Sequence, residues 1–334
     1  MKIAINGFGR IGKLVLRAFL EKKIKDVQVV AINELGGLES SIHLLKYDSI
    51  HGIIPFNINK TKKGIKVGSH NINFYSEKDP NNLPWKSLNV DIVLECSGVF
   101  TSKEKAIGHI NAGAKKVIIS APGTNVDKTI VQGVNNHELN SKHNIISNGS
   151  CTTNCLAPLA MVLDKELGID SGFMTTIHSY TGDQRTVDQT HKDLRRARAA
   201  AESMIPTSTG AAKAISLVLP KLKGKLDGTA IRVPTPNVSL IDFTFTSKKK
   251  TNPNKINSLI LKASKTKALK NILTINDMPL VSIDFNHNPS SSIFDSTQTQ
   301  VVKDKFCRVL SWYDNEWGFS NRMIETMLNL KKFI

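Results

Sequence analysis

The run Gly7-Phe8-Gly9-Arg10-Ile11-Gly12 constrains the fold most strongly, because it directly follows Lys2–Asn6, a stretch that reads as a short buried strand. The first glycine of this spacing permits a tight turn, the second lets a pyrophosphate approach the backbone, and the third lets helix pack on strand. Apolar residues at helical spacing follow as far as Phe19, and residues 27–32 read as a second strand. The segment therefore predicts a βαβ unit that binds a dinucleotide at the start of its helix.

An acidic residue, Glu34, follows the second predicted strand and lies 22 positions after Gly12. This spacing is close to the roughly 20 positions typical of the carboxylate that bonds the adenosine ribose. A carboxylate there favours NAD, because the 2′-phosphate of NADP would meet a like charge. On these residues alone, a glycine turn beside an unrelated surface glutamate remains an open alternative.

The two halves of the chain differ in pattern. Strands and helices alternate in the first half, as in a doubly wound sheet, with further strands predicted at 90–95, 116–120, 130–134 and 144–147 and a helix at 103–112. Long alternating strands dominate the second half, at 173–179, 229–233, 238–246, 280–285 and 306–313, with covering helices at 210–219 and 254–269 and a terminal helix at 318–332.

These patterns predict an α/β chain with two domains. A Rossmann dinucleotide-binding domain spans 1–149 and is joined by a C-terminal helix within 317–334. An α+β catalytic domain with a mostly antiparallel sheet spans 150–316.

Cys151 stands where a turn of small residues, 147–150, runs into an apolar helical pattern that ends near Gly168. A cysteine at a helix start meets the positive end of the macrodipole and unpaired backbone amides, which favour thiolate over thiol. The same amides can stabilise an oxyanion. Cys151 is therefore a candidate nucleophile, although a buried and inert cysteine fits these residues equally well.

His178 is the candidate base for this cysteine, because it ends a predicted strand beside the small polar turn 179–184. We expect its imidazole to be exposed at the edge of the sheet. Taken singly, a histidine in such a position more often has a purely structural role.

The net charge of +17 raises the alternative of a nucleic-acid-binding protein, because lysines that neutralise phosphates release counterions. The lysines are spread in pairs and short runs without interleaved aromatic residues, which favours solvated surfaces and makes nucleic acid an unlikely primary partner. The denser group Arg195-Arg196-x-Arg198 is a candidate for binding an anionic substrate or cofactor.

Cysteine usage and hydropathy indicate a compartment. The four cysteines are too few and too scattered for a disulfide framework or a zinc site. Met1 leads directly into a strand without a signal segment, and no apolar run approaches about 18 residues. We expect a cytoplasmic protein with reduced thiols, no metal and no membrane partner.

Blocks along the whole chain resemble phosphorylating, NAD-dependent glyceraldehyde-3-phosphate dehydrogenase. They lie at 6–12, 147–158, 178–181, 193–200, 206–213, 232–236 and 312–316. The resemblance implies a glycolytic and gluconeogenic enzyme that oxidises glyceraldehyde 3-phosphate with NAD and inorganic phosphate to 1,3-bisphosphoglycerate. It makes Cys151 the nucleophile that carries a thioester and His178 its activator, and it implies a homotetramer.

The resemblance also implies which residues bind the two anions and the cofactor. It implies that the substrate phosphate is bound by Thr181, Arg196 and Arg232. It implies that the attacking phosphate is bound by Ser150, Thr152, Thr209 and Gly210. The cofactor-binding residues are Gly7, Gly9, Arg10, Ile11, Gly12, Glu34, Lys78, Ser97, Ser120 and Asn315, of which Asn315 orients the carboxamide of the nicotinamide.

Three departures from the family pattern stand out. Glu34 replaces the usual aspartate, and Gln189-Thr190 replaces a Leu-Pro pair that helps to exclude NADP, so some use of NADP is an open alternative. Gly149 replaces an alanine, which affects only the flexibility of the turn.

Two rival functions remain to be weighed. Erythrose-4-phosphate dehydrogenase shares Asn33-Glu34-Leu35, but residues 179–182 and 208–211 resemble the phosphate-using enzyme instead. A basic RNA-binding or surface protein with residual dehydrogenase sequence is the rival from another class. The intact Cys151, His178 and glycine loop argue against loss of catalysis, though not against a second role.

Overall fold

In the computed structural model, which describes all residues 1–334, the chain forms two compact units. The first unit comprises Met1–Ile130, Asn136–Ser150 and Ser320–Ile334, and the second comprises Val131–Asn135 and Cys151–Phe319. Helix α8 (Trp317–Leu330) therefore begins in the second unit and continues in the first. The short segment Val131–Asn135 thus belongs to the second unit although it precedes Cys151 in the sequence.

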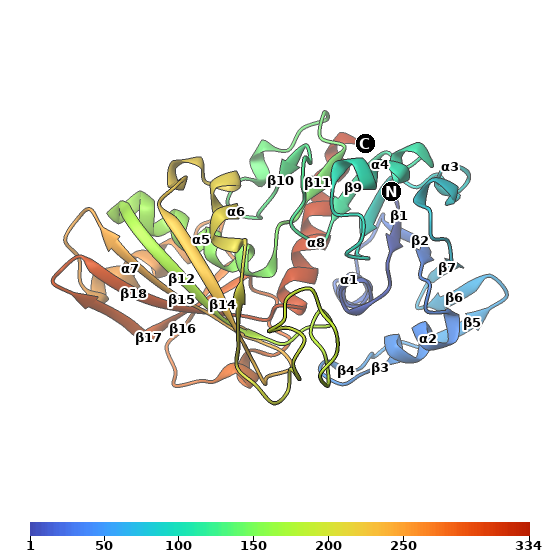
Figure 1. Cartoon of the computed structure of the whole chain (residues 1–334). Helices are drawn as coiled ribbons and strands as arrows, with labels where there is room; N and C mark the ends of the chain where they lie inside the picture. The colour runs from blue at the N-terminus through green and yellow to red at the C-terminus, as the bar shows by residue number, and fades with distance from the viewer. The chain divides into compact units, whose positions relative to one another are not determined.

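The first unit is built on a nine-stranded sheet (Figure 1). Its strands lie in the order β10 (Lys128–Thr129), β11 (Ile145–Ser147), β9 (Lys116–Ile119), β8 (Ile92–Glu95), β1 (Lys2–Asn6), β2 (Gln28–Asn33), β7 (His70–Tyr75), β6 (Gly64–Val67) and β5 (Ile58–Thr61). All neighbours from β10 to β7 are parallel, whereas β5, β6 and β7 pair antiparallel. A small hairpin of β3 (Tyr47–Asp48) and β4 (Gly52–Ile53) stands apart from this sheet.

The parallel strands β8 and β9 are buried along their whole length. The helices of this unit are α1 (Arg10–Glu21), α2 (Leu38–Lys46), α3 (Trp85–Leu88), α4 (Lys103–Asn111) and the part of α8 from Ser320. The Lys22 ammonium after α1 lies 3.6 Å from Glu325 of α8, so these two helices run beside each other. Ala4 of β1 packs in a separate cluster with Trp85 and Ala106. Strands buried on both sides are the arrangement that a doubly wound fold requires.

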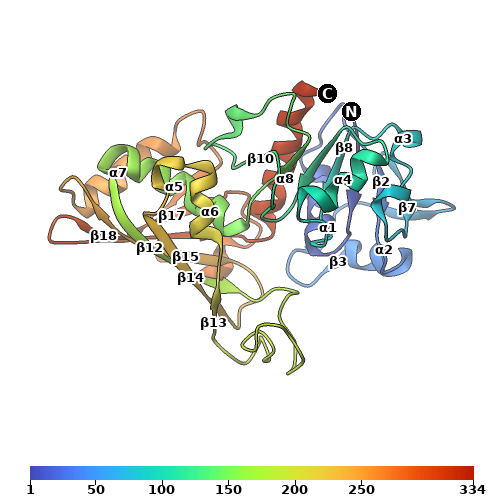
Figure 2. The ribbon, with the colours of Figure 1, turned by 45° about the horizontal axis from the view of Figure 1, so that its top comes forward.

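The second unit is a seven-stranded sheet with helices over one face (Figure 2). The strand order is β13 (Ile205–Ser208), β14 (Leu226–Val233), β12 (Ile169–Ser179), β15 (Ser239–Ser247), β18 (Phe306–Tyr313), β17 (Ser292–Val302) and β16 (Leu273–Asn276). Four of the six neighbouring pairs are antiparallel. The predicted fold class, a Rossmann domain plus a mostly antiparallel α+β domain, is confirmed.

The covering helices of this unit bury one side of the sheet. They are α5 (Cys151–Leu167), α6 (Ala211–Val218) and α7 (Pro253–Ser264). Leu156, Leu159 and Leu163 of α5 are fully buried in the core with Phe243 and Phe294 of the sheet. Strand β15 alternates buried and half-buried residues along its whole length, as a sheet covered on one face does. None of the helices in either unit combines the length and the apolar character needed to cross a lipid bilayer.

Two predicted strands are wrong. Residues 280–285 contain a short 3₁₀ helix, Ser282–Phe285, because the Asp284 carboxylate accepts the Val281 N–H at 2.9 Å and closes a turn. Residues 130–134 also turn, since the Val131 N–H donates to Asn135 Oδ1 at 2.8 Å. Strand β17 was not predicted, because its polar middle, 296–300, hides the alternation of its apolar ends.

Candidate active site

In the first unit, four predicted cofactor residues gather at the carboxyl ends of neighbouring strands. Strands β2, β1, β8 and β9 are adjacent in that order, and the residues that directly follow or lie just beyond their ends are Glu34, Gly7, Ser97 and Ser120. Ligands of doubly wound sheets bind at this edge. The structure thus brings these four residues together from segments far apart in the sequence.

The three glycines of the loop fit a bound dinucleotide, each for a different reason. Gly7 has φ +84°, and a Cβ there would lie 2.4 Å from Ser97 Cα. A Cβ on Gly12 would lie 2.1 Å from the Gly7 carbonyl oxygen. A Cβ on Gly9 would meet nothing within 4 Å, so space is open in front of this residue at the start of α1. An open backbone at a helix N-terminus suits a pyrophosphate.

Glu34 is held against the glycine loop. Its carboxylate accepts the Phe8 N–H at 2.6 Å and the Gly36 N–H at 2.9 Å. Arg10 at the start of α1 pairs with Asp48 at 2.5 Å. Ile11 is the second residue of the same helix and is half-buried, whereas Lys78 is exposed on the loop after β7.

In the second unit, Cys151 is the first residue of α5, as predicted from the sequence. Burial raises the pKa of its thiol above the ordinary value, and the Arg232 guanidinium and the hydroxyl and amide of Thr152 only partly offset this. In the resting chain, burial thus opposes the helix amides that were expected to favour the thiolate. Desolvation of the sulfur outweighs the helix amides, so a base within reach is needed to take the thiol proton.

His178 supplies such a base, but not from an exposed position. It lies on β12 between β14 and β15, inside the sheet, and is only 4% exposed, which corrects the prediction of an exposed edge residue. Its Nε2 is 3.5 Å from Cys151 Sγ. Burial and the nearby Arg232 lower the pKa of His178 to about 3, so the ring is neutral.

The second nitrogen of this ring is also held. His178 Nδ1 lies 2.7 Å from the Ser179 carbonyl oxygen. Arg232 Nη1, which can only donate, lies 2.8 Å from the same Nδ1 and favours the tautomer with the proton on Nε2. When Nδ1–H donates to the Ser179 carbonyl instead, Nε2 carries a lone pair that faces the thiol. In that tautomer the arrangement can accept the proton of Cys151.

Two arginines make the surroundings of His178 positive. Arg232 lies opposite His178 in the parallel pairing of β12 and β14, and its Nη1 is 2.8 Å from His178 Nδ1 and 2.9 Å from the Ser179 carbonyl. Arg232 Nε is buried without a hydrogen-bond partner. Arg196 is bound to Asp183 at 2.5 Å and to Thr207 Oγ1 at 2.9 Å. A buried donor without a partner is costly, and an anionic ligand would satisfy it.

The remaining predicted anion ligands occupy helix starts and turns. Thr209 Oγ1 accepts the Ala211 N–H at 3.2 Å, and Gly210 is the N-cap of α6, so these two residues do cap a helix. Ser150 precedes α5 and belongs to the first unit. Thr181 is half-buried in the turn after β12.

Tyr313 is a site residue that the sequence did not indicate. Its hydroxyl lies 2.8 Å from Thr152 Oγ1 and 2.9 Å from Thr176 Oγ1, and its ring packs edge-on against His178 with 5.9 Å between centroids. Burial raises its pKa well above 10, so it stays a neutral hydroxyl. In the sequence, Tyr313 lies in the family-like block 312–316 and at the end of a predicted strand, but neither feature indicated a role for its hydroxyl.

Asn315 is positioned by two serines. Its Oδ1 accepts hydrogen bonds from Ser179 Oγ at 2.9 Å and Ser239 Oγ at 2.8 Å. The side-chain amide is therefore oriented with its oxygen occupied, which leaves the NH₂ group as the end that can meet a ligand.

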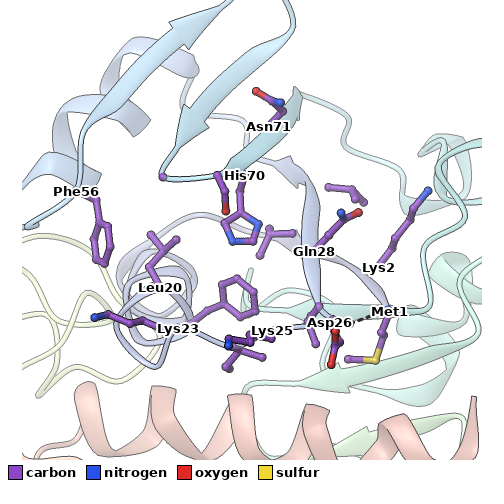
Figure 3. A pocket seen from close by; sticks show the side chains of 17 residues that line it. Met1, Lys2, Leu20, Lys23, Lys25, Asp26, Gln28, Phe56, His70 and Asn71 are labelled. Carbon is purple, nitrogen blue, oxygen red and sulfur yellow. Dashed lines mark hydrogen bonds between the residues drawn. The ribbon is translucent and has the colours of Figure 1, made fainter.

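A cavity of about 1110 Å³ in the first unit is not part of this site. Figure 3 shows its lining, with His70 among Phe56, Leu20 and Gln28. It lies at the amino ends of β1 and β2, the opposite ends of these strands from Gly7 and Glu34, and holds none of the predicted site residues. No group of three histidine, cysteine or acidic side chains is arranged to hold a metal ion.

Comparisons with known proteins agree on one family. Residues 1–103 match the model of the glyceraldehyde 3-phosphate dehydrogenase NAD binding domain, and residues 150–315 match its C-terminal domain. The chain is 57% identical to glyceraldehyde-3-phosphate dehydrogenase of Xanthobacter flavus and 53% identical to that of Zymomonas mobilis, each over 99% of both chains. Glyceraldehyde-3-phosphate dehydrogenase 2 of Bacillus subtilis is 52% identical over 97% of this chain and 95% of its own. The chain belongs to the glyceraldehyde-3-phosphate dehydrogenase family.

Proposed function

We propose that the chain is an oxidoreductase that converts glyceraldehyde 3-phosphate, with inorganic phosphate and NAD, to 1,3-bisphosphoglycerate and NADH. The observation that carries the proposal is the 3.5 Å between Cys151 Sγ and His178 Nε2, in a chain that matches both domains of one family. Relatives that carry the name of this enzyme match over nearly the full length of the chain. The cofactor is NAD, as the match to the NAD binding domain indicates.

The reaction begins with the thiol. Cys151 Sγ adds to the aldehyde carbon while His178 Nε2 takes the thiol proton, which gives the alkoxide of a hemithioacetal. His178 is neutral in the resting chain, and its tautomer with the proton on Nδ1 leaves Nε2 free to act as this base. Bound NAD supplies the acceptor for the hydride that leaves the adduct, and a thioester on Cys151 remains. Phosphate then attacks the thioester carbon, and the sulfur of Cys151 leaves as acyl phosphate forms.

The charged groups around the thiol support a phosphorylated substrate. The unpaired Nε of Arg232 is a buried donor that a phosphate oxygen can satisfy, and Arg196 contributes a second positive charge that acts on both His178 and Arg232. The free NH₂ of Asn315 is suited to the carboxamide oxygen of the nicotinamide. We assign the roles of Thr181, Ser150, Thr152, Thr209 and Gly210 on the family match, and these roles, the homotetramer and the cytoplasmic location stay predictions.

Reduction of the cofactor, followed by absorbance, tests the function. The assay compares glyceraldehyde 3-phosphate with erythrose 4-phosphate, NAD with NADP, and the presence with the absence of inorganic phosphate. Fast reduction of NAD that depends on phosphate supports the proposal. Phosphate-independent turnover, or a preference for erythrose 4-phosphate, contradicts it. If NADP is reduced at a comparable rate, we would attribute this use of NADP to the departures from the family pattern at Glu34, Gln189 and Thr190.

The Cys151→Ser variant tests the nucleophile. A hydroxyl is a much weaker nucleophile at neutral pH, so turnover should fall on the order of 10³-fold or more while NAD binding, measured by calorimetry, stays unchanged. Cys155→Ser is the matched control, because Cys155 lies one turn along the same helix and is fully buried. Comparable turnover in Cys151→Ser and the wild type would refute the assignment.

A further inference from the structure

A buried carboxylate in the first unit plays no part in the proposed chemistry. Glu95, the last residue of β8, is 1% exposed. Its Oε2 accepts hydrogen bonds from Asn6 Nδ2 at 2.6 Å and from His109 Nε2 at 2.8 Å. Its Oε1 accepts from the Ser97 backbone N–H at 2.8 Å and from the Ser97 hydroxyl. Such a group is costly to bury, and four donors on one carboxylate keep it hydrogen-bonded on both oxygens.

The His109 imidazole, which contacts Glu95, donates to it in only one tautomer. Trp85 Nε1 lies 3.0 Å from His109 Nδ1, and an indole nitrogen is always a donor. His109 Nδ1 therefore accepts, and Nε2 carries the proton that is given to Glu95. Both His109 and Trp85 are 0% exposed, so no water replaces either bond.

The carboxylate also sets the direction of a chain of amides. Because Glu95 accepts, Asn6 turns its NH₂ toward it and its Oδ1 toward Asn33, whose Nδ2 donates at 2.7 Å. Asn33 then pairs with Glu77 through two backbone bonds, giving its second amide proton to the Glu77 carbonyl and accepting the Glu77 N–H, each at 2.8 Å. Both side-chain amides in this hydrogen-bond network thus have one orientation.

Asn6, Asn33, Glu77 and Glu95 of this network each lie one or two positions before a predicted cofactor-binding residue in the sequence. Asn6 precedes Gly7, Asn33 precedes Glu34, Glu77 precedes Lys78, and Glu95 lies two residues before Ser97. We propose that Glu95 is a positioning residue which, through this buried network, holds the four cofactor-binding loops in their binding geometry before NAD arrives. The inference rests on the proposed use of NAD by this unit.

The physical basis is preorganisation. Loops that are already ordered lose less conformational entropy when a ligand binds, so affinity rises without a new contact to the ligand. A fully satisfied buried network fixes such geometry better than surface bonds do. Glu95 itself need not touch the cofactor for this effect.

The variant Glu95→Gln probes the network with almost no change of shape. A glutamine has one donor end. With its oxygen toward Asn6 and His109, its NH₂ faces the Ser97 N–H, and two donors then oppose each other. With the opposite orientation, the NH₂ faces the donors of Asn6 and His109. Either way at least one loop loses its partner.

We expect Glu95→Gln to raise the Kd for NAD about tenfold in calorimetry, with the site number used to count folded protein. The KM for NAD should rise in parallel while kcat at saturating NAD stays within about twofold, because the thiol site is untouched. Without NAD, amide exchange of residues 7–12 and 97–99 should become faster. Glu104→Gln, an exposed carboxylate on α4 bound to Asn125, is the control and should match the wild type.

Distinct outcomes separate the two proposals. Wild-type protein that does not bind NAD at all would overturn the proposed function. Wild-type binding with an unchanged Kd in folded Glu95→Gln would overturn the role of Glu95 alone. If Glu95→Gln does not fold, Asn33→Ala removes the middle of the network without a change of charge, and an unchanged Kd in that variant would refute the network.

Discussion

At the scale of single residues, Arg232 connects the base and the anion site. Its Nη1 contacts both His178 Nδ1 and the Ser179 carbonyl, while its Nε is buried and unpaired. Burial raises the pKa of the Cys151 thiol and lowers that of His178, and the guanidinium partly offsets the first shift and adds to the second. Arg232 thus shifts the pKa values of two groups and keeps one N–H donor that no protein group satisfies.

We predict that Arg232→Met weakens recognition of the phosphorylated substrate in particular. Hydrogen bonds to charged groups contribute about 1.5–3 kcal/mol, so the KM for glyceraldehyde 3-phosphate should rise about ten- to a hundredfold. The KM for unphosphorylated glyceraldehyde, measured in parallel, should change much less. Arg308→Met, at the ion pair with Asp242 elsewhere in the sheet, serves as the control. An equal loss for both substrates would remove Arg232 from the phosphate site.

At the scale of elements, the turn between β1 and α1 uses its glycines for different purposes. Gly12 is needed because α1 packs against the Gly7 carbonyl, whereas the space in front of Gly9 is open. The sequence spacing predicted the tight turn at Gly7 and the close packing at Gly12, since both follow from the geometry of a strand that turns directly into a helix. The pyrophosphate contact at Gly9 stays a prediction.

Alanine at the two glycines should therefore give opposite results. Gly12→Ala places a Cβ against backbone and should lower the free energy of unfolding by about 1–3 kcal/mol. Gly9→Ala has a backbone φ of −72°, which alanine adopts, so the fold should keep its stability while NAD affinity falls. Thermal unfolding without NAD and calorimetric titration with NAD measure the two effects. Destabilisation by Gly9→Ala, or none by Gly12→Ala, would contradict this reading of the turn.

Some elements of this fold could be predicted from the sequence and others could not. The glycine turn, helix α5 with Cys151 at its start, and most long strands were predictable because each repeats a local pattern of apolar residues. Strand β17 and the hairpin strands between 47 and 75 were not, because polar residues interrupt their alternation. The burial of His178 and the role of Tyr313 depend on which strands become neighbours, and no local pattern encodes that.

At the scale of the whole molecule, each unit has its own core, and the second unit buries a neutral histidine at its site. The pKa of His178 is about 3 in the folded chain, below the roughly 6.5 of an unfolded histidine. The unfolded chain therefore binds a proton more readily between these values. The stability contribution is complete above pH 6.5 and is lost as the pH falls toward 3.

We predict that this residue makes the second unit sensitive to acid. Between pH 7 and pH 5, the wild type should lose about 2 kcal/mol of unfolding free energy more than His178→Gln, because glutamine does not titrate. Urea unfolding of both proteins over this range gives the difference, in which the contributions of the carboxylates cancel. Parallel pH dependence in the two proteins would mean that His178 is not held neutral.

The parallel pairing of β12 with β14 places His178 directly opposite Arg232, so their separation is a property of strand register and not of any loop. A slip by one residue would turn one of the two side chains to the other face of the sheet. Insertions in the connecting segment 180–225 that spare strand β13 and the predicted anion-binding residues Thr181, Arg196, Thr209 and Gly210 should leave this register unchanged, so the pair stays together. For protein engineering, this means that substitutions in the loops can alter the substrate range while strands β12 and β14 keep His178 and Arg232 in place.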